Sequence, residues 1–332
     1  MNKHALPASI PTKPFQPRFY LKGAMLQTLL ASLKIRAWGK KSILKMQKHM
    51  ILHVNGGTRL LGYYTPQPGT SSKGLVILLH GWEGSSQSTY ILTCGTFLYQ
   101  NGFSVFRLNL RDHGNSHHLN KGLFYATLLE EVWAAVDQAA KLNADAPVHL
   151  VGFSLGGNFA IRIAARYAEK GGSNIHRVVS ISPVLDPNKA TDKIDGNPMI
   201  LGYFLRKWRK SLAAKQRLFP NHYNFDDIMH LRSLRKMTAR LLETYTHYAS
   251  TQAYFHAYSI PPELTQIITL PLTILTSSDD PIIPVEDFHA LKPGRQTEVI
   301  VHDHGGHNGF IEGLFKPAWY DWFLLERLGG AL

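Results

Sequence analysis

The chain has 332 residues, a net charge of +13 and 44% hydrophobic residues. This composition excludes extensive disorder, because disordered chains carry too few apolar side chains to form a core. A single cysteine, Cys94, excludes a disulfide framework, a thiolate zinc cluster and an iron–sulfur site within one chain. A membrane-spanning helix needs about 20 apolar residues, and no apolar stretch of the sequence comes near that length. The proline-rich start shows no apolar core of a signal peptide. We therefore expect a soluble, cytoplasmic protein.

The positive charge is concentrated at the start of the chain. Twelve lysines and arginines lie between Lys3 and Lys73, and the first acidic residue is Glu83. The remaining 24 basic and 23 acidic residues nearly cancel. A basic surface suits an anionic partner, so a weak, peripheral contact with an anionic membrane, without insertion, is one expectation. A solvated basic surface with no partner is the simpler alternative. The chain carries no recognisable nucleic-acid-binding motif, so no nucleic acid partner is expected.

In chain order, the first predicted element is a helix over 21–38 with a leucine-rich face. Two short strands over 49–55 and 58–64 follow, joined at Asn55-Gly56-Gly57 as a hairpin. Further strands are predicted over 75–79, 103–110, 148–152, 178–181, 272–275 and 299–301. Helices are predicted over 86–100, over 122–142, after Ser154 and after Pro317. Strands that alternate with helices in this way are typical of an α/β fold with a mostly parallel sheet.

The alternation is interrupted between Asp186 and Leu264, where the chain is helix-rich, basic and aromatic. We interpret this stretch as a helical cap inserted at the edge of the sheet. The predicted organisation has three parts. A basic N-terminal arm and helix (1–48) packs on the body, the core consists of 49–185 and 265–332, and the cap spans 186–264.

The strongest chemical signal is Gly152-Phe153-Ser154-Leu155-Gly156, which lies between a predicted strand and a predicted helix. A serine on such a tight turn needs small neighbours, and the two glycines supply them. The turn lifts the hydroxyl clear of the sheet, and the Leu155 N–H at the helix start faces a developing oxyanion. The motif therefore predicts a nucleophilic Ser154.

An elbow serine needs an acid and a histidine later in the chain, in that order. Asp279 and Asp280 follow the predicted strand over 272–275. The predicted strand over 299–301 is followed by a segment with three histidines, His302-Asp303-His304-Gly305-Gly306-His307. The loop after the first all-apolar strand begins His80-Gly81-Trp82, where the Trp82 N–H is placed to be the second oxyanion donor. The sequence thus predicts a serine, acid and histidine triad with two backbone donors.

Two rival interpretations use the same residues. The spacing His302-x-His304-x-x-His307 resembles a metal-ligand cluster, but no histidine follows His307 to complete a second half-site. A non-catalytic binding protein is the other rival, although such proteins usually lose the serine or the histidine.

Together these motifs resemble the α/β-hydrolase superfamily, and within it the YheT-like branch, which includes esterases and lipid-acting relatives. The likeness covers nearly the whole chain. It rests on Phe15-Gln16-Pro17, Leu26-Gln27-Thr28, His80 to Ser85, Gly152 to Asn158, Asp279-Asp280-Pro281 and Gly305 to Phe310. Two departures are Leu26, where relatives often have histidine, and Asp112 to Ser116, where near relatives often have a cysteine-containing loop.

The resemblance implies an α/β-hydrolase fold with a Ser154, Asp280 and His307 triad and an oxyanion hole made by Trp82 and Leu155. In this fold the triad acid commonly stands four residues before a proline, as Asp280 does before Pro284. The predicted function is hydrolysis of carboxylic esters with an apolar acyl group, through an acyl-enzyme and without a metal or cofactor. Thioester, amide or carbon–carbon cleavage on the same triad remains the alternative.

Overall fold

The fold centres on an eight-stranded sheet, described by a computed structural model over residues 13–38, 42–69, 72–143, 145–172 and 174–329. The strand order is β1-β2-β4-β3-β5-β6-β7-β8. Strand β2 is antiparallel to both neighbours, and the other adjacent pairs are parallel. The strands are β1 (Lys48–His53), β2 (Arg59–Thr65), β3 (Leu75–Leu79), β4 (Ser104–Leu108), β5 (Val148–Phe153), β6 (Ile175–Ile181), β7 (Leu272–Ser277) and β8 (Thr297–His302). The predicted α/β architecture is confirmed.

The central strands are apolar throughout because helices cover both faces of the sheet. In β3, Leu75, Ile77 and Leu79 belong to the core on one face, while Val76 and Leu78 belong to the core on the other. All five side chains are fully buried. This alternation follows from the two-residue repeat of a strand.

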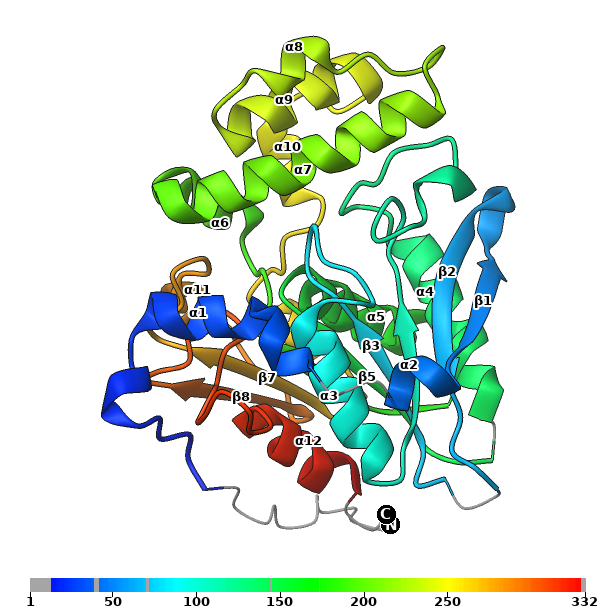
Figure 1. The fold of residues 1–332 in the computed structure, drawn as a ribbon, viewed down its shortest axis with the longest axis vertical. Helices are drawn as coiled ribbons and strands as arrows, with labels where there is room; N and C mark the ends of the chain where they lie inside the picture. The colour runs from blue at the N-terminus through cyan, green and yellow to red at the C-terminus, as the bar shows by residue number, and fades with distance from the viewer. Residues whose placement is uncertain (1–12, 39–41, 70–71, 144, 173, 330–332) are drawn as a thin grey trace.

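Helices of the core lie in two layers. On one face are α1 (Ala24–Ser32), α2 (Ser42–Met46), α3 (Thr89–Gln100) and α12 (Trp319–Gly329), and on the other are α4 (Leu129–Ala140) and α5 (Leu155–Lys170) (Figure 1). Helix α11 (Val285–His289) follows β7. Short 3-10 turns are η1 (Phe19–Leu21), η2 (Lys34–Ala37), η3 (Asn55–Gly57), η4 (His117–Leu119), η5 (Lys141–Asn143) and η6 (Leu264–Gln266).

Five helices between β6 and β7 form a layer above the sheet, at the top of Figure 1. They are α6 (Pro187–Asp195), α7 (Pro198–Leu218), α8 (Asp226–Met229), α9 (Leu234–Tyr245) and α10 (Thr251–His256). Their starts are local sequence signals: the side chains of Asp186 and Asn197 cap α6 and α7, each directly before a proline. A side-chain acceptor followed by proline satisfies the free amides of a first helical turn.

The sequence prediction was wrong at two helix boundaries. The helix predicted over 21–38 ends at Ser32, and the extended Leu33 separates it from η2. The helix predicted from Gly122 begins only at Leu129. Tertiary hydrogen bonds take the backbone of this second segment out of the helix: Asp112 accepts the Phe124 N–H, and the Tyr254 hydroxyl accepts the Ala126 N–H. The segment instead becomes a wall of the pocket described below.

Candidate active site

Ser154 occupies the sharp turn between β5 and α5. Its backbone has φ 55° and ψ −117°, a conformation that residues other than glycine rarely adopt. The flanking glycines are required by close backbone contact. A Cβ atom at Gly152 would lie 2.1 Å from the Gly156 carbonyl oxygen, and one at Gly156 would lie 2.4 Å from the Leu79 carbonyl oxygen. The turn therefore presents the serine hydroxyl from a rigid, strained position.

A chain of hydrogen bonds joins Ser154, His307 and Asp280, all three of which are buried. His307 Nε2 lies 2.9 Å from Ser154 Oγ, and His307 Nδ1 lies 2.8 Å from Asp280 Oδ2. The other carboxylate oxygen, Asp280 Oδ1, accepts the Ile282 and Ile283 N–H groups at 2.7 and 2.9 Å. With its Nδ1 proton donated to Asp280, the imidazole has its Nε2 lone pair free to accept the serine proton.

The neighbouring acid, Asp279, holds a different partner. Its Oδ1 accepts the Gly306 N–H at 2.8 Å, and its Oδ2 lies 3.7 Å from His304 Nδ1. Asp279 therefore stabilises the backbone of the loop that carries His307, while Asp280 contacts the imidazole itself.

The loop after β3 approaches the serine closely. A Cβ atom at Gly81 would lie 3.0 Å from Ser154 Cβ, so Trp82 follows at the edge of the serine site. Leu155 is the first residue of α5, where the N–H has no partner within the helix. In the described part of the chain, neither the Trp82 nor the Leu155 N–H donates a hydrogen bond. Both amides are therefore available to an oxyanion.

Two buried histidines hold this loop in place. His113 Nε2 accepts the Glu83 N–H at 3.1 Å, and its Nδ1 lies 2.7 Å from the Arg111 carbonyl oxygen. His80 makes the matching pair of contacts from the loop after β3. Its Nδ1 lies 2.8 Å from the Gly81 carbonyl oxygen, and its Nε2 accepts the Leu110 N–H. Burial lowers the pKa of His80 to about 4 and that of His113 well below its ordinary value. Both rings therefore stay neutral, and each bridges the loops after β3 and β4.

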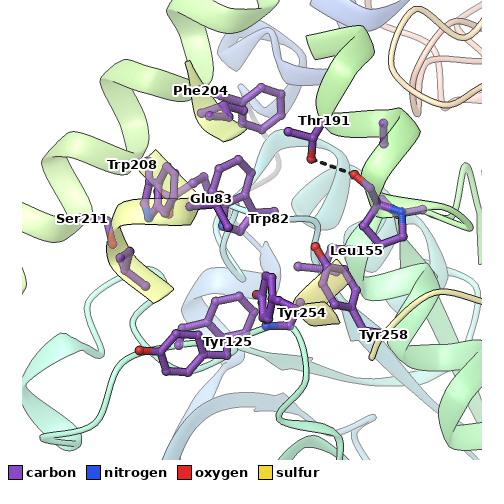
Figure 2. A pocket seen from close by; sticks show the side chains of 18 of the residues that line it. Trp82, Glu83, Tyr125, Leu155, Thr191, Phe204, Trp208, Ser211, Tyr254 and Tyr258 are labelled. Carbon is purple, nitrogen blue, oxygen red and sulfur yellow. Dashed lines mark hydrogen bonds between the residues drawn. The ribbon is translucent and has the colours of Figure 1, made fainter. Parts of the chain in front are cut away.

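A pocket of about 130 Å³ extends from Ser154 under the cap. Trp82 stacks on Phe204 of α7 with ring centroids 5.3 Å apart and meets Trp208 edge-on at 5.1 Å (Figure 2). Further apolar walls come from core and cap alike, including Leu123, Phe124, Ile194, Leu212, Leu241, Tyr254 and Tyr258. This lining suits an apolar group of a bound molecule.

The same pocket has a polar wall, which sequence reasoning missed. It includes Glu83, Asp112 and Lys215. Burial raises the pKa of Glu83 to about 8, against the opposing effect of the nearby Lys207 charge. A signal for Lys215 exists in the sequence, because it continues the inward face of α7 at helical spacing from Trp208 and Leu212. A lysine on an apolar helical face has to find a buried partner.

The three histidines of the metal interpretation have separate partners. His302 meets the Trp319 ring edge-on at 4.6 Å, His304 lies beside Asp279, and His307 bonds Asp280 and Ser154. Within the described ranges no group of three or more acids, histidines and cysteines is suited to hold a metal ion. The same ranges hold no helix with the length and hydropathy to cross a membrane.

Comparison with known proteins gives a consistent result. Residues 74–314 match the model of the alpha/beta hydrolase fold family. The embryogenesis-associated protein EMB8 of Picea glauca is 23% identical over 342 residues, which cover 95% of this chain and 72% of that protein. YheT of Escherichia coli (strain K12), which is named as an esterase, is 23% identical over 75% of this chain and 74% of its own. Among solved structures, an esterase of Pyrococcus furiosus shares the fold, with a TM-score of 0.57 at 19% identity over 88% of this chain and 95% of that one.

Proposed function

Since this chain belongs to the α/β-hydrolase family, we propose that it is a serine hydrolase that cleaves carboxylic esters through a covalent acyl-enzyme. One observation carries the proposal: Ser154, His307 and Asp280 form a continuous hydrogen-bonded chain, and Ser154 lines a largely apolar pocket. Esterases among the similar proteins support the same bond type.

In the first half of the reaction, Ser154 Oγ attacks the ester carbonyl carbon while His307 Nε2 takes its proton. Asp280 holds the imidazole in the correct tautomer and stabilises the imidazolium. The Trp82 and Leu155 N–H groups bind the oxyanion, each contributing about 3–4 kcal/mol of transition-state stabilisation. The carbon–oxygen bond to the alcohol then breaks, and His307 gives its proton to the departing alkoxide.

In the second half, water replaces the alcohol. His307 takes a proton from this water as it attacks the acyl carbonyl, and the oxyanion is bound as before. The bond to Ser154 Oγ then breaks, the serine regains its proton from His307, and a carboxylic acid leaves. Every step uses side chains and amides of this chain.

The pocket supports an apolar acyl group as the recognised part of the substrate. Its walls beyond Ser154 are mostly aromatic and aliphatic side chains of α6, α7, α9 and α10. An acyl chain lying there is removed from water, which favours binding by about 0.8 kcal/mol per methylene.

The test is a fluorophosphonate labelling experiment on the full chain, followed by a substrate screen. The screen contains p-nitrophenyl esters of graded length, an acylglycerol, a phospholipid, a thioester and an anilide. We expect labelling and ester turnover. Absence of labelling would contradict the proposed nucleophile, and faster turnover of the thioester or anilide than of every ester would contradict the proposed bond type.

A further inference from the structure

The first described residues carry an unusual surface, which we call the N-terminal face: Phe19, Tyr20, Leu26, Leu29, Leu33, Ile35, Trp38 and Met46. These are eight of the fifteen large hydrophobic side chains that are exposed in the described ranges. Phe19 is 84% and Trp38 76% exposed. They all come from one stretch of 28 residues, 19–46, and so many exposed apolar side chains in one segment indicate a binding surface.

The face is presented by a rigid element. Leu26 and Leu29 are three residues apart and lie on one side of α1, and the exposed Leu33 directly follows the helix. The same helix is packed on the body through the buried Leu30 and Ala31. In Figure 1, α1 lies in front of the sheet, at the outside of the molecule. The exposed leucines therefore project from a helix that is already anchored.

The charge around the face selects its partner. The same stretch of chain carries exposed cations at Lys13, Arg18, Lys22, Lys34, Lys45 and Lys48, and no acid occurs in the sequence before Glu83. A second copy of this chain would bring like charges together, and a nucleic acid would offer no apolar layer for the leucines. A bilayer with anionic headgroups satisfies both requirements, because phosphates meet the cations and acyl chains meet the leucines and rings.

We propose that the N-terminal face docks the protein on anionic membranes by shallow insertion of its leucines and aromatic rings. The charge of the sequence alone predicts a peripheral membrane contact without insertion. The exposed apolar side chains add shallow insertion to that expectation. The apolar contribution should persist at salt concentrations that screen the cations.

The experiment uses the full chain and vesicles of phosphatidylcholine with or without phosphatidylglycerol, at low and high salt. We expect preferential sedimentation with phosphatidylglycerol and partial retention at high salt. Leu29→Ser should weaken binding about tenfold, by the transfer energy of a leucine side chain. Leu218→Ser is the matched control, because Leu29 and Leu218 are 53% and 47% exposed, and Leu218 lies in the cap. It should bind like the wild type.

Three outcomes would overturn the proposal: no sedimentation at low salt, complete release at high salt, or equal losses from Leu29→Ser and Leu218→Ser. A dimer in solution that Leu29→Ser dissociates would also overturn it, because the face would then serve self-association.

A separate observation concerns the inner side of the same helix, and it rests on the proposed function. The Thr28 hydroxyl accepts the backbone N–H of His307 at 2.9 Å and donates to the Ala24 carbonyl oxygen at 2.8 Å. Next to it, the fully buried Gln27 bonds both backbone groups of Ile311: its Nε2 donates to the carbonyl oxygen and its Oε1 accepts the N–H. Two consecutive residues of α1 therefore hold the loop that carries His307, some 280 positions away in sequence.

The loop needs such support. Between Gly305 and Phe310, four residues have positive φ: Gly305, Gly306, Asn308 and Phe310. A Cβ atom at Gly306 would lie 2.4 Å from the Ala24 carbonyl oxygen, so helix and loop touch backbone to backbone. A strained backbone persists only where its surroundings hold it in place.

The geometry points to Gln27 and Thr28 as positioning residues for the His307 base. Thr28→Val keeps the shape of the side chain and removes the acceptor, while Thr28→Ser keeps the hydroxyl. We expect Thr28→Val to lower kcat and the rate of fluorophosphonate labelling about tenfold to a hundredfold with little change in KM, because small displacements of a base slow proton transfer. Thr28→Ser should stay near the wild-type rate.

The control is Thr89→Val, which removes a hydroxyl that donates to the Ser32 carbonyl oxygen at the end of the same helix, away from His307. It should leave kcat unchanged. An unchanged kcat in Thr28→Val, or an equal loss in Thr28→Ser, would overturn the positioning role. Failure of the wild type to react with the probe would instead overturn the proposed function, so the two failures are distinguishable.

Discussion

Lys215 of the cap and Asp112 of the core form a buried ion pair, with 2.8 Å between Nζ and Oδ1. The ammonium has three donors and uses all of them, because it also bonds the carbonyl oxygens of Asn120 and Gly122 at 2.6 and 2.9 Å. Asp112 in turn accepts the Phe124 N–H, which belongs to the pocket wall. This pair joins cap, core and pocket lining at one point.

Lys215→Met should therefore destabilise the fold by about 3–5 kcal/mol, because it leaves the Asp112 carboxylate buried without its partner. Adding Asp112→Asn should recover part of the loss. Chemical denaturation followed by circular dichroism measures both. Lys292→Met is the matched control: its ion pair with Glu263 is exposed, so the change should leave the free energy of unfolding nearly the same. Equal effects of the two lysine variants would contradict a structural role for the buried pair.

Ser154→Ala should abolish ester hydrolysis and fluorophosphonate labelling while leaving the fold intact. Alanine has the same Cβ as serine, so the strained turn accepts it without a new contact. His307→Ala should remove turnover as well, because no other group lies at Ser154 Oγ to take its proton in the described ranges. Activity gels and mass spectrometry of the labelled peptide check this. Continued labelling of Ser154→Ala would end the serine-hydrolase proposal.

Substitutions of the two neighbouring aspartates should differ sharply in effect. Asp280→Asn places an amide beside His307 Nδ1, where it cannot stabilise the imidazolium, so kcat should fall by about 10³–10⁴. Asp279→Asn keeps an acceptor for the Gly306 N–H and should cost less than about tenfold. Steady-state kinetics on one p-nitrophenyl ester separates them. A larger loss from Asp279→Asn would reverse the assignment.

Motifs that carry their own backbone requirement were predictable from the sequence. The strand before Ser154 and the glycines around it follow from local sterics, and β3 follows from five consecutive apolar residues. The N-cap residues of α6 and α7, Asp186 and Asn197, each precede a proline and are local signals of the same kind.

Features that depend on contacts between distant segments were not predictable. The pattern over 122–128 resembles a helix, yet bonds to Asp112 and Tyr254 hold its backbone in a non-helical conformation. Thr28 shows the same limit within the site, since nothing in its neighbourhood along the chain indicates a bond to His307.

Glu83 should give the enzyme an alkaline limit. Burial raises the pKa of its carboxyl from 4.5 to about 8, with Lys207 opposing the shift and Asp112 adding to it. The side chain is therefore neutral below about pH 8 and charged above it, next in the chain to Trp82, the proposed oxyanion donor. Since negative charge there disfavours the oxyanion, kcat/KM should decline above about pH 8. Glu83→Gln mimics the neutral form and should lose this decline.

The stability effect of Glu83 has the same origin. The raised pKa means that folding favours the neutral carboxyl, so its contribution to stability is complete below pH 4.5 and is lost as the pH rises through about 8. Urea unfolding of wild type and Glu83→Gln at pH 5 and pH 9 measures this. We expect the difference between the two proteins to change in favour of Glu83→Gln at the higher pH. A pH-independent difference would contradict burial as the cause.

Chain-length preference should follow the pocket under the cap. Each added methylene that enters the apolar lining should raise kcat/KM about fourfold, until the pocket is full and the rate falls. Leu241→Trp adds bulk to a buried wall residue of α9, so it should move the optimum to shorter acyl chains. Met199→Trp is the control, because Met199 is exposed on α7 outside the pocket lining and should leave the optimum unchanged. Kinetics over a p-nitrophenyl ester series measures both. If the wild type prefers the acetyl ester over every longer one, or if Leu241→Trp leaves the optimum in place, the acyl group binds elsewhere.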